Sequence, residues 1–125
     1  MMKYFLSIGS NINPEDNIKF AIDELSLVLD ALNISTTHKT PSEGFKGDDF
    51  LNLAISGYSE KSFNDLNIVL KNIEDRAGRD RNVPKFSSRC LDIDIVLQIE
   101  NDNIIYESDE IKKYSFVSEP LKEII

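Results

Sequence analysis

Two aspartates separated by one residue are the side chains best suited to chemistry in this 125-residue sequence. Asp92 and Asp94 alternate with Leu91, Ile93 and Ile95, a pattern typical of a strand in which every second residue faces the core. The two carboxylates should therefore share the opposite face. They repel each other unless a cation lies between them, and Mg²⁺ fits because it uses one or two carboxylates with water and phosphate oxygens. The alternative is an ordinary solvated strand face, which the spacing alone favours.

A basic segment precedes the aspartates. Residues 76–89 hold five basic residues and one acidic one, a net charge of +4, in a chain whose net charge is −8. Arginine binds phosphate through two parallel hydrogen bonds, and arginines beside carboxylate-bound Mg²⁺ are what phosphoryl transfer needs. The alternative is a solvated basic loop. The candidate phosphate ligands are Arg79, Arg81, Lys85 and Arg89. The acidity of the rest argues against nucleic acid or an anionic membrane as a partner.

A third group of residues indicates a site for a flat molecule. Leu51 belongs to a core face by alternation, so Phe50 and Asn52 should share the face proposed for the aspartates. An aromatic ring beside an amide can stack on a heterocycle and hydrogen-bond to its edge. The other interpretation is an edge aromatic residue next to a polar strand residue.

The elements that must position these residues follow from hydrophobic periodicity. Helices are expected from Pro14, with an apolar stripe that continues to Leu32, and over 63–77, where an S-x-x-D capping signal begins at Ser62. The predicted strands are 3–8, 33–39, 50–58 and 91–97. The resulting βαββαβ order predicts a ferredoxin-like α+β fold, a four-stranded antiparallel sheet with two helices on one face, with residues 1–125 forming a single domain.

Cysteine and histidine each occur once, which excludes an intramolecular disulfide, a thiolate zinc site and mechanisms that need two histidines. The apolar run at the N-terminus is too short for a signal peptide, and no stretch approaches the ~18 apolar residues of a membrane span. The expected compartment is the cytoplasm.

Six ordered blocks make the chain resemble the 6-hydroxymethyl-7,8-dihydropterin pyrophosphokinase family of the folate pathway. The G-R-x-R and R-x-L-D-x-D blocks agree with the family in their spacing, and the matches cover nearly the whole chain. The blocks are Ile8-Gly9-Ser10-Asn11; Thr40-Pro41 with Gly44; Phe50-Leu51-Asn52; Glu74 with Gly78-Arg79-Asp80-Arg81; Arg89-Cys90-Leu91-Asp92-Ile93-Asp94; and Phe116-Val117 with Pro120-Leu121-Lys122-Glu123-Ile124.

The resemblance implies that pyrophosphate passes from ATP to the pterin hydroxymethyl oxygen and that AMP leaves. It implies that Asp92 and Asp94 hold two Mg²⁺ ions, with Arg79 and Arg89 also catalytic. It implies a pterin site of Phe50 and Phe116 as stacking rings with Asn52, Thr40 and Glu43 at the ring edge. It implies a nucleotide site of Glu74, Arg79, Arg81, Lys85 and Arg89.

The chain departs from the family pattern on the ATP side. Glu107-Ser108 stands where the family usually has Pro-His, and Tyr114 stands where an arginine is usual. Family members usually also continue beyond the Leu121–Ile124 block, so the resemblance is to a divergent, C-terminally short member. Two further hypotheses remain open: a non-catalytic or weakly active pterin-binding relative, and a ferredoxin-like interaction module that binds neither ligand.

Overall fold

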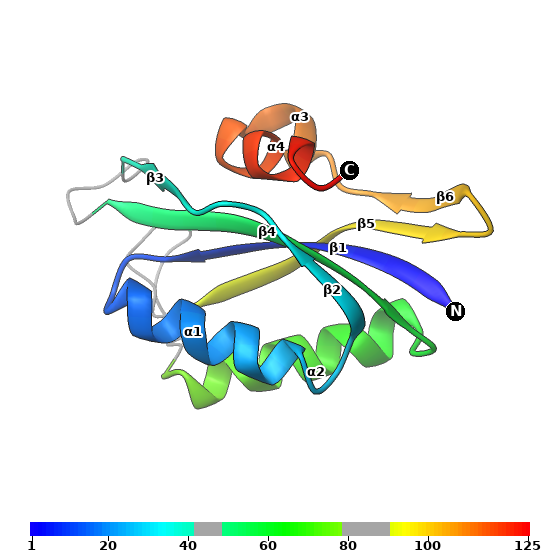
Figure 1. The fold of residues 1–125 in the computed structure, drawn as a ribbon, viewed down its shortest axis with the longest axis horizontal. Helices are drawn as coiled ribbons and strands as arrows, with labels where there is room; N and C mark the ends of the chain where they lie inside the picture. Colours follow the sequence, from blue (N-terminus) through cyan, green and yellow to red (C-terminus); the bar gives the residue numbers. More distant parts are fainter. Residues whose placement is uncertain (42–48, 79–90) are drawn as a thin grey trace.

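The computed structural model of the protein describes residues 1–41, 49–78 and 91–125. Within these residues the chain forms one antiparallel sheet with the strand order β2-β4-β1-β5-β6, and β3 also pairs with β4 (Figure 1). The strands are β1 (Met2–Ser10), β2 (Asp30–Ile34), β3 (His38–Thr40), β4 (Phe50–Ser59), β5 (Asp92–Glu100) and β6 (Asn103–Glu107).

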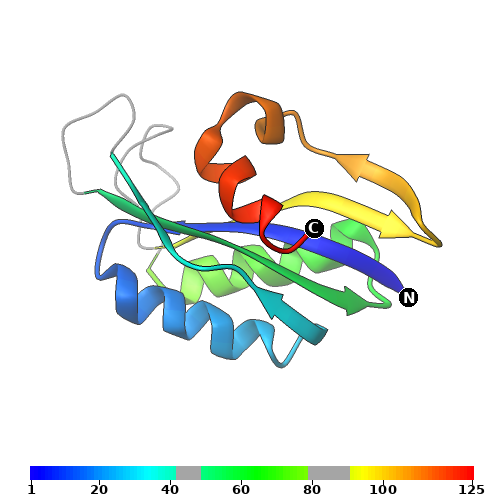
Figure 2. The ribbon, with the colours of Figure 1, turned by 45° about the horizontal axis from the view of Figure 1, so that its top comes forward.

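Helices cover both faces of this sheet (Figures 1 and 2). α1 (Pro14–Leu25) and α2 (Phe63–Arg76) lie on one face, and α3 (Glu110–Lys113) and α4 (Ser115–Lys122) lie on the other. The α+β class and the antiparallel sheet are confirmed. The prediction of four strands is wrong, because the described residues form six, and the pair of C-terminal helices adds a layer that the ferredoxin-like scheme lacks.

The main core lies between the sheet and α1 and α2. Alternate residues of the central strands face these helices and are almost fully buried, as the period-two pattern predicts. The residues are Tyr4, Leu6, Ile8, Leu53, Ile55, Leu91, Ile93 and Ile95 on the strand side, with Ile18, Ala21, Leu25, Leu66, Leu70 and Ile73 from the helices. The strand residues that alternate with them therefore point to the opposite face of the sheet, which α4 covers.

The helix starts follow the sequence in part. Ser62 Oγ accepts a hydrogen bond from Asp65 N at 3.2 Å, so the capping signal of α2 is confirmed. α1 begins with Pro14 in its first turn, but Asn13 adopts a left-handed conformation (φ 42°) and makes no side-chain capping bond. Its carbonyl oxygen accepts from Asn17 N at 3.0 Å instead.

α1 is shorter than its apolar stripe suggested. The helix ends at Leu25, and Leu29 from the connection to β2 and Leu32 from β2 itself pack on the same core. This connection runs so close to β4 that a Cβ atom on Gly57 would lie 2.8 Å from Leu29 Cβ. A helix-like hydrophobic spacing therefore continues past the helix because the following segment crosses the same core.

The predicted strand 33–39 is two strands. Both strands pair with β4, and Ser35 interrupts this pairing between them. The Ser35 hydroxyl accepts a hydrogen bond from Ala54 N of β4 at 2.8 Å, in place of a backbone carbonyl. β6 was not among the predicted strands. It forms a hairpin with β5 through Asn101 and Asp102, whose φ values of 51° and 65° are typical of a type I′ turn.

A β-bulge in β5 gives the sheet its second core. Leu6 pairs with Ile95 but Phe5 pairs with Leu97, so Val96 is an extra residue. Simple alternation over the predicted strand 91–97 would put Leu97 on the face of Ile95, and the bulge reverses this. Leu97 packs instead with Phe5, Ala54, Val96, Val117, Leu121 and Ile124 in the cluster beneath α4.

The end of α4 is fastened to the segment between β2 and β3. The carboxylate of Glu123 accepts hydrogen bonds from Thr36 N at 2.8 Å and from Thr36 Oγ1 at 2.9 Å, and it pairs with His38 Nε2. The backbone hydrogen bond from Thr36, with help from His38, holds the pKa of the Glu123 carboxyl below its ordinary value. The ionised carboxylate therefore stabilises the packing of α4.

We expect Glu123→Gln to lower the free energy of unfolding at pH 7. Because the folded pKa is depressed, the stabilisation is present above the usual carboxyl pKa of 4.5 and is lost as the pH falls through the folded value. Urea denaturation at pH 7 and pH 3.5 should show a difference between the two proteins at pH 7 that shrinks at pH 3.5. Glu119→Gln, which removes a carboxylate paired with Lys122 on the same helix, is the matched control. Equal effects of the two substitutions would contradict this role of Glu123.

Candidate active site

The strand register places an amide and a carboxylate on either side of a glycine. Gly9 of β1 pairs with Asn52 of β4 and with Asp92 of β5, so the three residues form one row across the sheet. They lie on the face of α4, because Ala54, two residues from Asn52, packs beneath that helix. A Cβ on Gly9 would lie 2.9 Å from Asn52 Oδ1, so only glycine leaves room between the two polar side chains.

Thr40, Phe50 and Asn52 come together at the β3–β4 pair. Thr40 pairs directly with Phe50, and Asn52 Nδ2 donates a hydrogen bond to Thr40 Oγ1 at 2.6 Å. Asn52 is only 4% exposed, so this bond fixes the orientation of its amide. The sequence prediction that Phe50 and Asn52 share the face of the aspartates agrees with the strand register.

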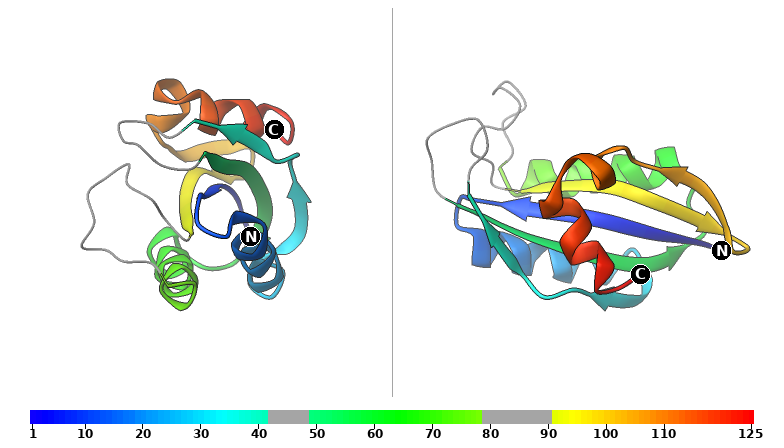
Figure 3. Two further views of the ribbon diagram at one scale, coloured as in Figure 1. Left: turned by 90° about the vertical axis from the view of Figure 1, so that its left-hand side faces the viewer. Right: turned by 90° about the horizontal axis from the view of Figure 1, so that it is seen from above.

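Phe116 belongs to α4 on the same face of the sheet (Figure 3). Its ring stacks on that of Tyr114, with centroids 4.9 Å apart and an interplanar angle of 18°. Both rings also pack at the margin of the core beneath α4. Tyr114, which stands where the family resemblance expects an arginine, therefore supports a ring proposed for pterin binding.

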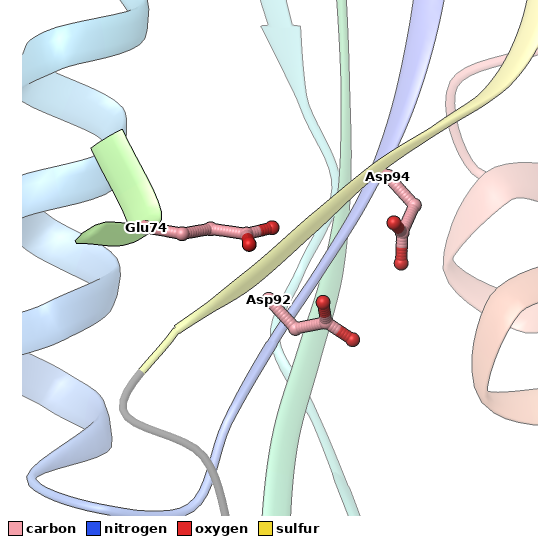
Figure 4. Close-up of side chains that lie close together, drawn as sticks. All are labelled: Glu74, Asp92 and Asp94. Carbon is pink, nitrogen blue, oxygen red and sulfur yellow. The ribbon is translucent and has the colours of Figure 1, made fainter. Parts of the chain in front are cut away.

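Asp92 and Asp94 are joined by a third carboxylate. Oxygen atoms of Glu74, Asp92 and Asp94 all lie within 4.8 Å of one another. Figure 4 shows the two aspartates leaving β5 on one side and Glu74 approaching the strand from α2 on the other. Glu74 is fully buried, whereas the aspartates are partly exposed. The cluster therefore has one inner and two outer carboxylates.

Lys71 and Glu74 hold the edge of β5 at Ile93. β6 pairs with β5 only from Leu97 onward. The N–H and C=O of Ile93, four residues earlier, are therefore not paired with β6. Glu74 Oε2 accepts from Ile93 N at 2.7 Å, and Lys71 Nζ donates to Ile93 O at 2.9 Å. Lys71 Nζ also donates to Glu74 Oε2 at 2.9 Å and to Asp94 Oδ1 at 3.2 Å. Two side chains of α2 thus replace a neighbouring strand.

Sequence reasoning missed Lys71. The available signal was its position three residues before Glu74 on a predicted helix, which places both side chains on one helical face. Sequence reasoning could not reveal that this face meets the edge of β5, since that depends on where β6 ends.

The carboxylate cluster shifts the pKa of Asp94. Burial and the negative charge of Asp92 raise the pKa of Asp94 to about 6, although Lys71 acts in the opposite direction. A divalent cation would relieve this repulsion, and the donors are carboxylate oxygens, which Mg²⁺ prefers. The residues present therefore fit such an ion.

Several predicted site residues lie outside the described part of the chain: Glu43, Arg79, Arg81, Lys85 and Arg89. Ser108, which stands where the resemblance expects a histidine, is described and is nearly buried. Its N–H donates to Val96 O at 2.9 Å, and its hydroxyl accepts from Glu110 N at 3.2 Å. Ser108 therefore connects the bulged strand to the start of α3.

These features define an α+β sheet protein with a carboxylate pair beside an amide and an aromatic side chain on one face. The chain belongs to the 7,8-dihydro-6-hydroxymethylpterin-pyrophosphokinase (HPPK) family, because the model of that family matches residues 5–125. A folate synthesis bifunctional protein of Arabidopsis thaliana is 32% identical over 131 residues, which cover 96% of this chain and 26% of that protein. The chain spans about a quarter of the length of this curated relative. No helix in the described ranges is long and apolar enough to cross a bilayer.

We expect Glu74→Ala to lower the free energy of unfolding by about 3 kcal/mol, because it removes the acceptor of the buried Ile93 N–H and one carboxylate partner of Lys71. Denaturant titration followed by circular dichroism measures this change. Glu74→Gln, which keeps an acceptor for Ile93, is the control and should cost less. A loss below about 1 kcal/mol for Glu74→Ala would show that Glu74 does not support the strand.

We expect Asp94→Asn to stabilise the metal-free protein by about 1 kcal/mol at pH 7. The folded pKa of about 6 lies above the usual 3.8, so ionisation of Asp94 costs folded-state stability as the pH rises between these values. The Asp94 side chain is 43% exposed, and solvent screening reduces the effect accordingly.

Urea denaturation in a chelator at several pH values tests this sign. The advantage of Asp94→Asn should grow as the pH rises from 4 to 6 and then level off. A variant less stable than the parent throughout would show that the contact with Lys71 outweighs the repulsion from Asp92.

Proposed function

We propose that the protein transfers pyrophosphate from ATP to the hydroxymethyl group of 6-hydroxymethyl-7,8-dihydropterin in folate biosynthesis, releasing AMP. The observation that carries the proposal is the pair Asp92 and Asp94, on the sheet face that also bears Asn52. Membership of the HPPK family supports it. The substrate oxygen would form a bond to the β-phosphorus of ATP as the bond from that phosphorus to the α,β-bridging oxygen breaks. The hydroxyl proton would pass to water, and AMP would leave with the bridging oxygen. Residues 1–125 would act as one catalytic unit.

Asp92 and Asp94 would hold Mg²⁺, with two ions expected from the resemblance. Bound there, Mg²⁺ would supply the positive charge that neutralises phosphate oxygens during transfer. Lys71 fixes one oxygen of Asp94 at 3.2 Å, which orients the carboxylate before substrate binds. Arg79, Arg81, Lys85 and Arg89 are proposed, from the sequence, to bind the phosphates and to stabilise charge during transfer.

The pterin would bind between rings and against a fixed amide. Phe50 and Phe116 would stack on its two faces, and Asn52 would hydrogen-bond to its edge with groups near Thr40 and Glu43. The support for this arrangement is that Thr40 orients the Asn52 amide at 2.6 Å, and that Phe50 pairs with Thr40 in the same ladder. A buried amide with a fixed orientation discriminates between heterocycles by their pattern of donors and acceptors.

A second candidate function is pterin binding with little or no catalysis. It is favoured by Ser108 and Tyr114, which occupy positions where the family resemblance expects a histidine and an arginine. Both residues have internal contacts, Ser108 with Val96 and Glu110 and Tyr114 with Phe116. The loss of one preorganised donor costs roughly 10²–10³ in rate.

We expect the protein to release AMP when it is incubated with 6-hydroxymethyl-7,8-dihydropterin, ATP and Mg²⁺. Asp92→Asn and Asp94→Asn should each lower the rate by about 10²–10³, because each removes a charged ligand of the metal. Chromatographic detection of AMP measures the rate. Asp109→Asn is the control, since it removes an exposed carboxylate paired with Lys113.

Calorimetry with pterin and ATP separates the alternatives. Pterin binding with no AMP at high protein concentration would establish the second candidate function. No binding of either ligand would overturn both and leave the interaction module.

A further inference from the structure

Lys71 brings a positive charge into the carboxylate cluster from the far side of β5. Its Nζ lies 2.9 Å from Glu74 Oε2 and 3.2 Å from Asp94 Oδ1. It is held in this place because it also donates to Ile93 O at 2.9 Å, and its side chain is only 30% exposed. A lysine tied to a backbone carbonyl and two carboxylates is a fixed charge and not a mobile surface group.

We propose that Lys71 weakens the binding of a bare divalent cation at Asp92 and Asp94, and so favours a cation that arrives already bound to a polyphosphate. The inference rests on the proposed function, because it assumes that these aspartates hold the metal. It concerns a positioning residue, since Lys71 would act on the metal through Asp94 and through its charge.

The charge of the cluster supports this inference. Glu74, Asp92 and Asp94 carry three negative charges when ionised, and Lys71 offsets one of them. A dication that enters the cluster is repelled by the ammonium at a separation of a few ångströms. A complex of one divalent cation with ATP carries net negative charge, so the same ammonium attracts it. One fixed charge therefore acts with opposite sign on the two forms of the metal.

The geometry separates this role from simple support of the fold. If Lys71 only oriented Asp94, its removal would loosen the site and weaken metal binding. If its charge dominates, its removal strengthens the binding of the bare metal. The direction of the change therefore distinguishes the two roles, whatever the enzyme's activity.

The test measures Mn²⁺ binding to the whole protein by calorimetry at pH 8, with no nucleotide, for the parent and for Lys71→Gln. Glutamine keeps an amide donor for Glu74 and Ile93 but has no charge. Lys71→Met, similar in length, is a second neutral variant in case the first does not fold. Circular dichroism and a cooperative thermal transition establish folding.

Two controls accompany these variants. Lys19→Gln makes the same change in net charge on exposed α1, where Lys19 pairs with Asp23. Lys71→Arg keeps the charge inside the cluster. Both controls should bind Mn²⁺ within about threefold of the parent.

We expect the neutral Lys71 variants to bind Mn²⁺ about tenfold more tightly than the parent. We also expect them to bind the Mn²⁺ complex of a non-hydrolysable ATP analogue no more tightly. Unchanged or weaker binding of bare Mn²⁺ by the folded variants would overturn the inference, as would an equal gain in Lys19→Gln.

The binding of Mn²⁺ to Asp92→Asn and Asp94→Asn distinguishes failure of the inference from failure of the proposed function. If these substitutions weaken Mn²⁺ binding but loss of Lys71 does not strengthen it, the metal site stands and the role of Lys71 is wrong. If Mn²⁺ binding is absent from the parent and from the Lys71 variants alike, both the metal site and the inference are overturned.

Discussion

The candidate site depends on which groups hydrogen-bond to the backbone of Ile93, at the edge of β5 between Asp92 and Asp94. A strand at the edge of a sheet exposes backbone groups that need partners, and β6 ends opposite Leu97, before it could supply them at Ile93. Lys71 and Glu74 supply them from α2. A second strand in that place would have restricted access to the aspartates from the side. Because two side chains take the place of a strand, no further strand covers this edge, and the positive charge of Lys71 lies beside Asp94.

The sheet has a core on both faces, and the site occupies the part of the α4 face that apolar side chains leave open. The bulge at Val96 makes this possible. Before it, β5 presents Asp92 and Asp94 to this face, and after it the strand presents Leu97 to the cluster beneath α4. One extra residue thus divides a single strand into a polar end and an apolar end. α4 can pack firmly on the sheet because the charged residues are confined to one end.

Much of this arrangement could be predicted from the sequence, and the failures share a cause. Alternation correctly identified the shared face of Asp92 and Asp94 and the core face of Ile93, because both depend only on neighbouring residues in one strand. Leu97, β6 and Lys71 were misjudged or missed because each depends on pairing between strands or between a helix and a strand edge. Such pairing leaves little trace in local periodicity.

The two departures from the family pattern have a structural use in this chain. Ser108 joins the bulge of β5 to the start of α3, and Tyr114 stacks on Phe116 where that ring enters α4. Both side chains contact the protein itself, because the Ser108 hydroxyl accepts from Glu110 N and the Tyr114 ring stacks on Phe116. Tyr114 therefore supports the ring that is proposed to stack on the pterin. Under the proposed function, the positive charge for ATP would come from Arg79, Arg81, Lys85 and Arg89, together with Lys71 beside the carboxylates.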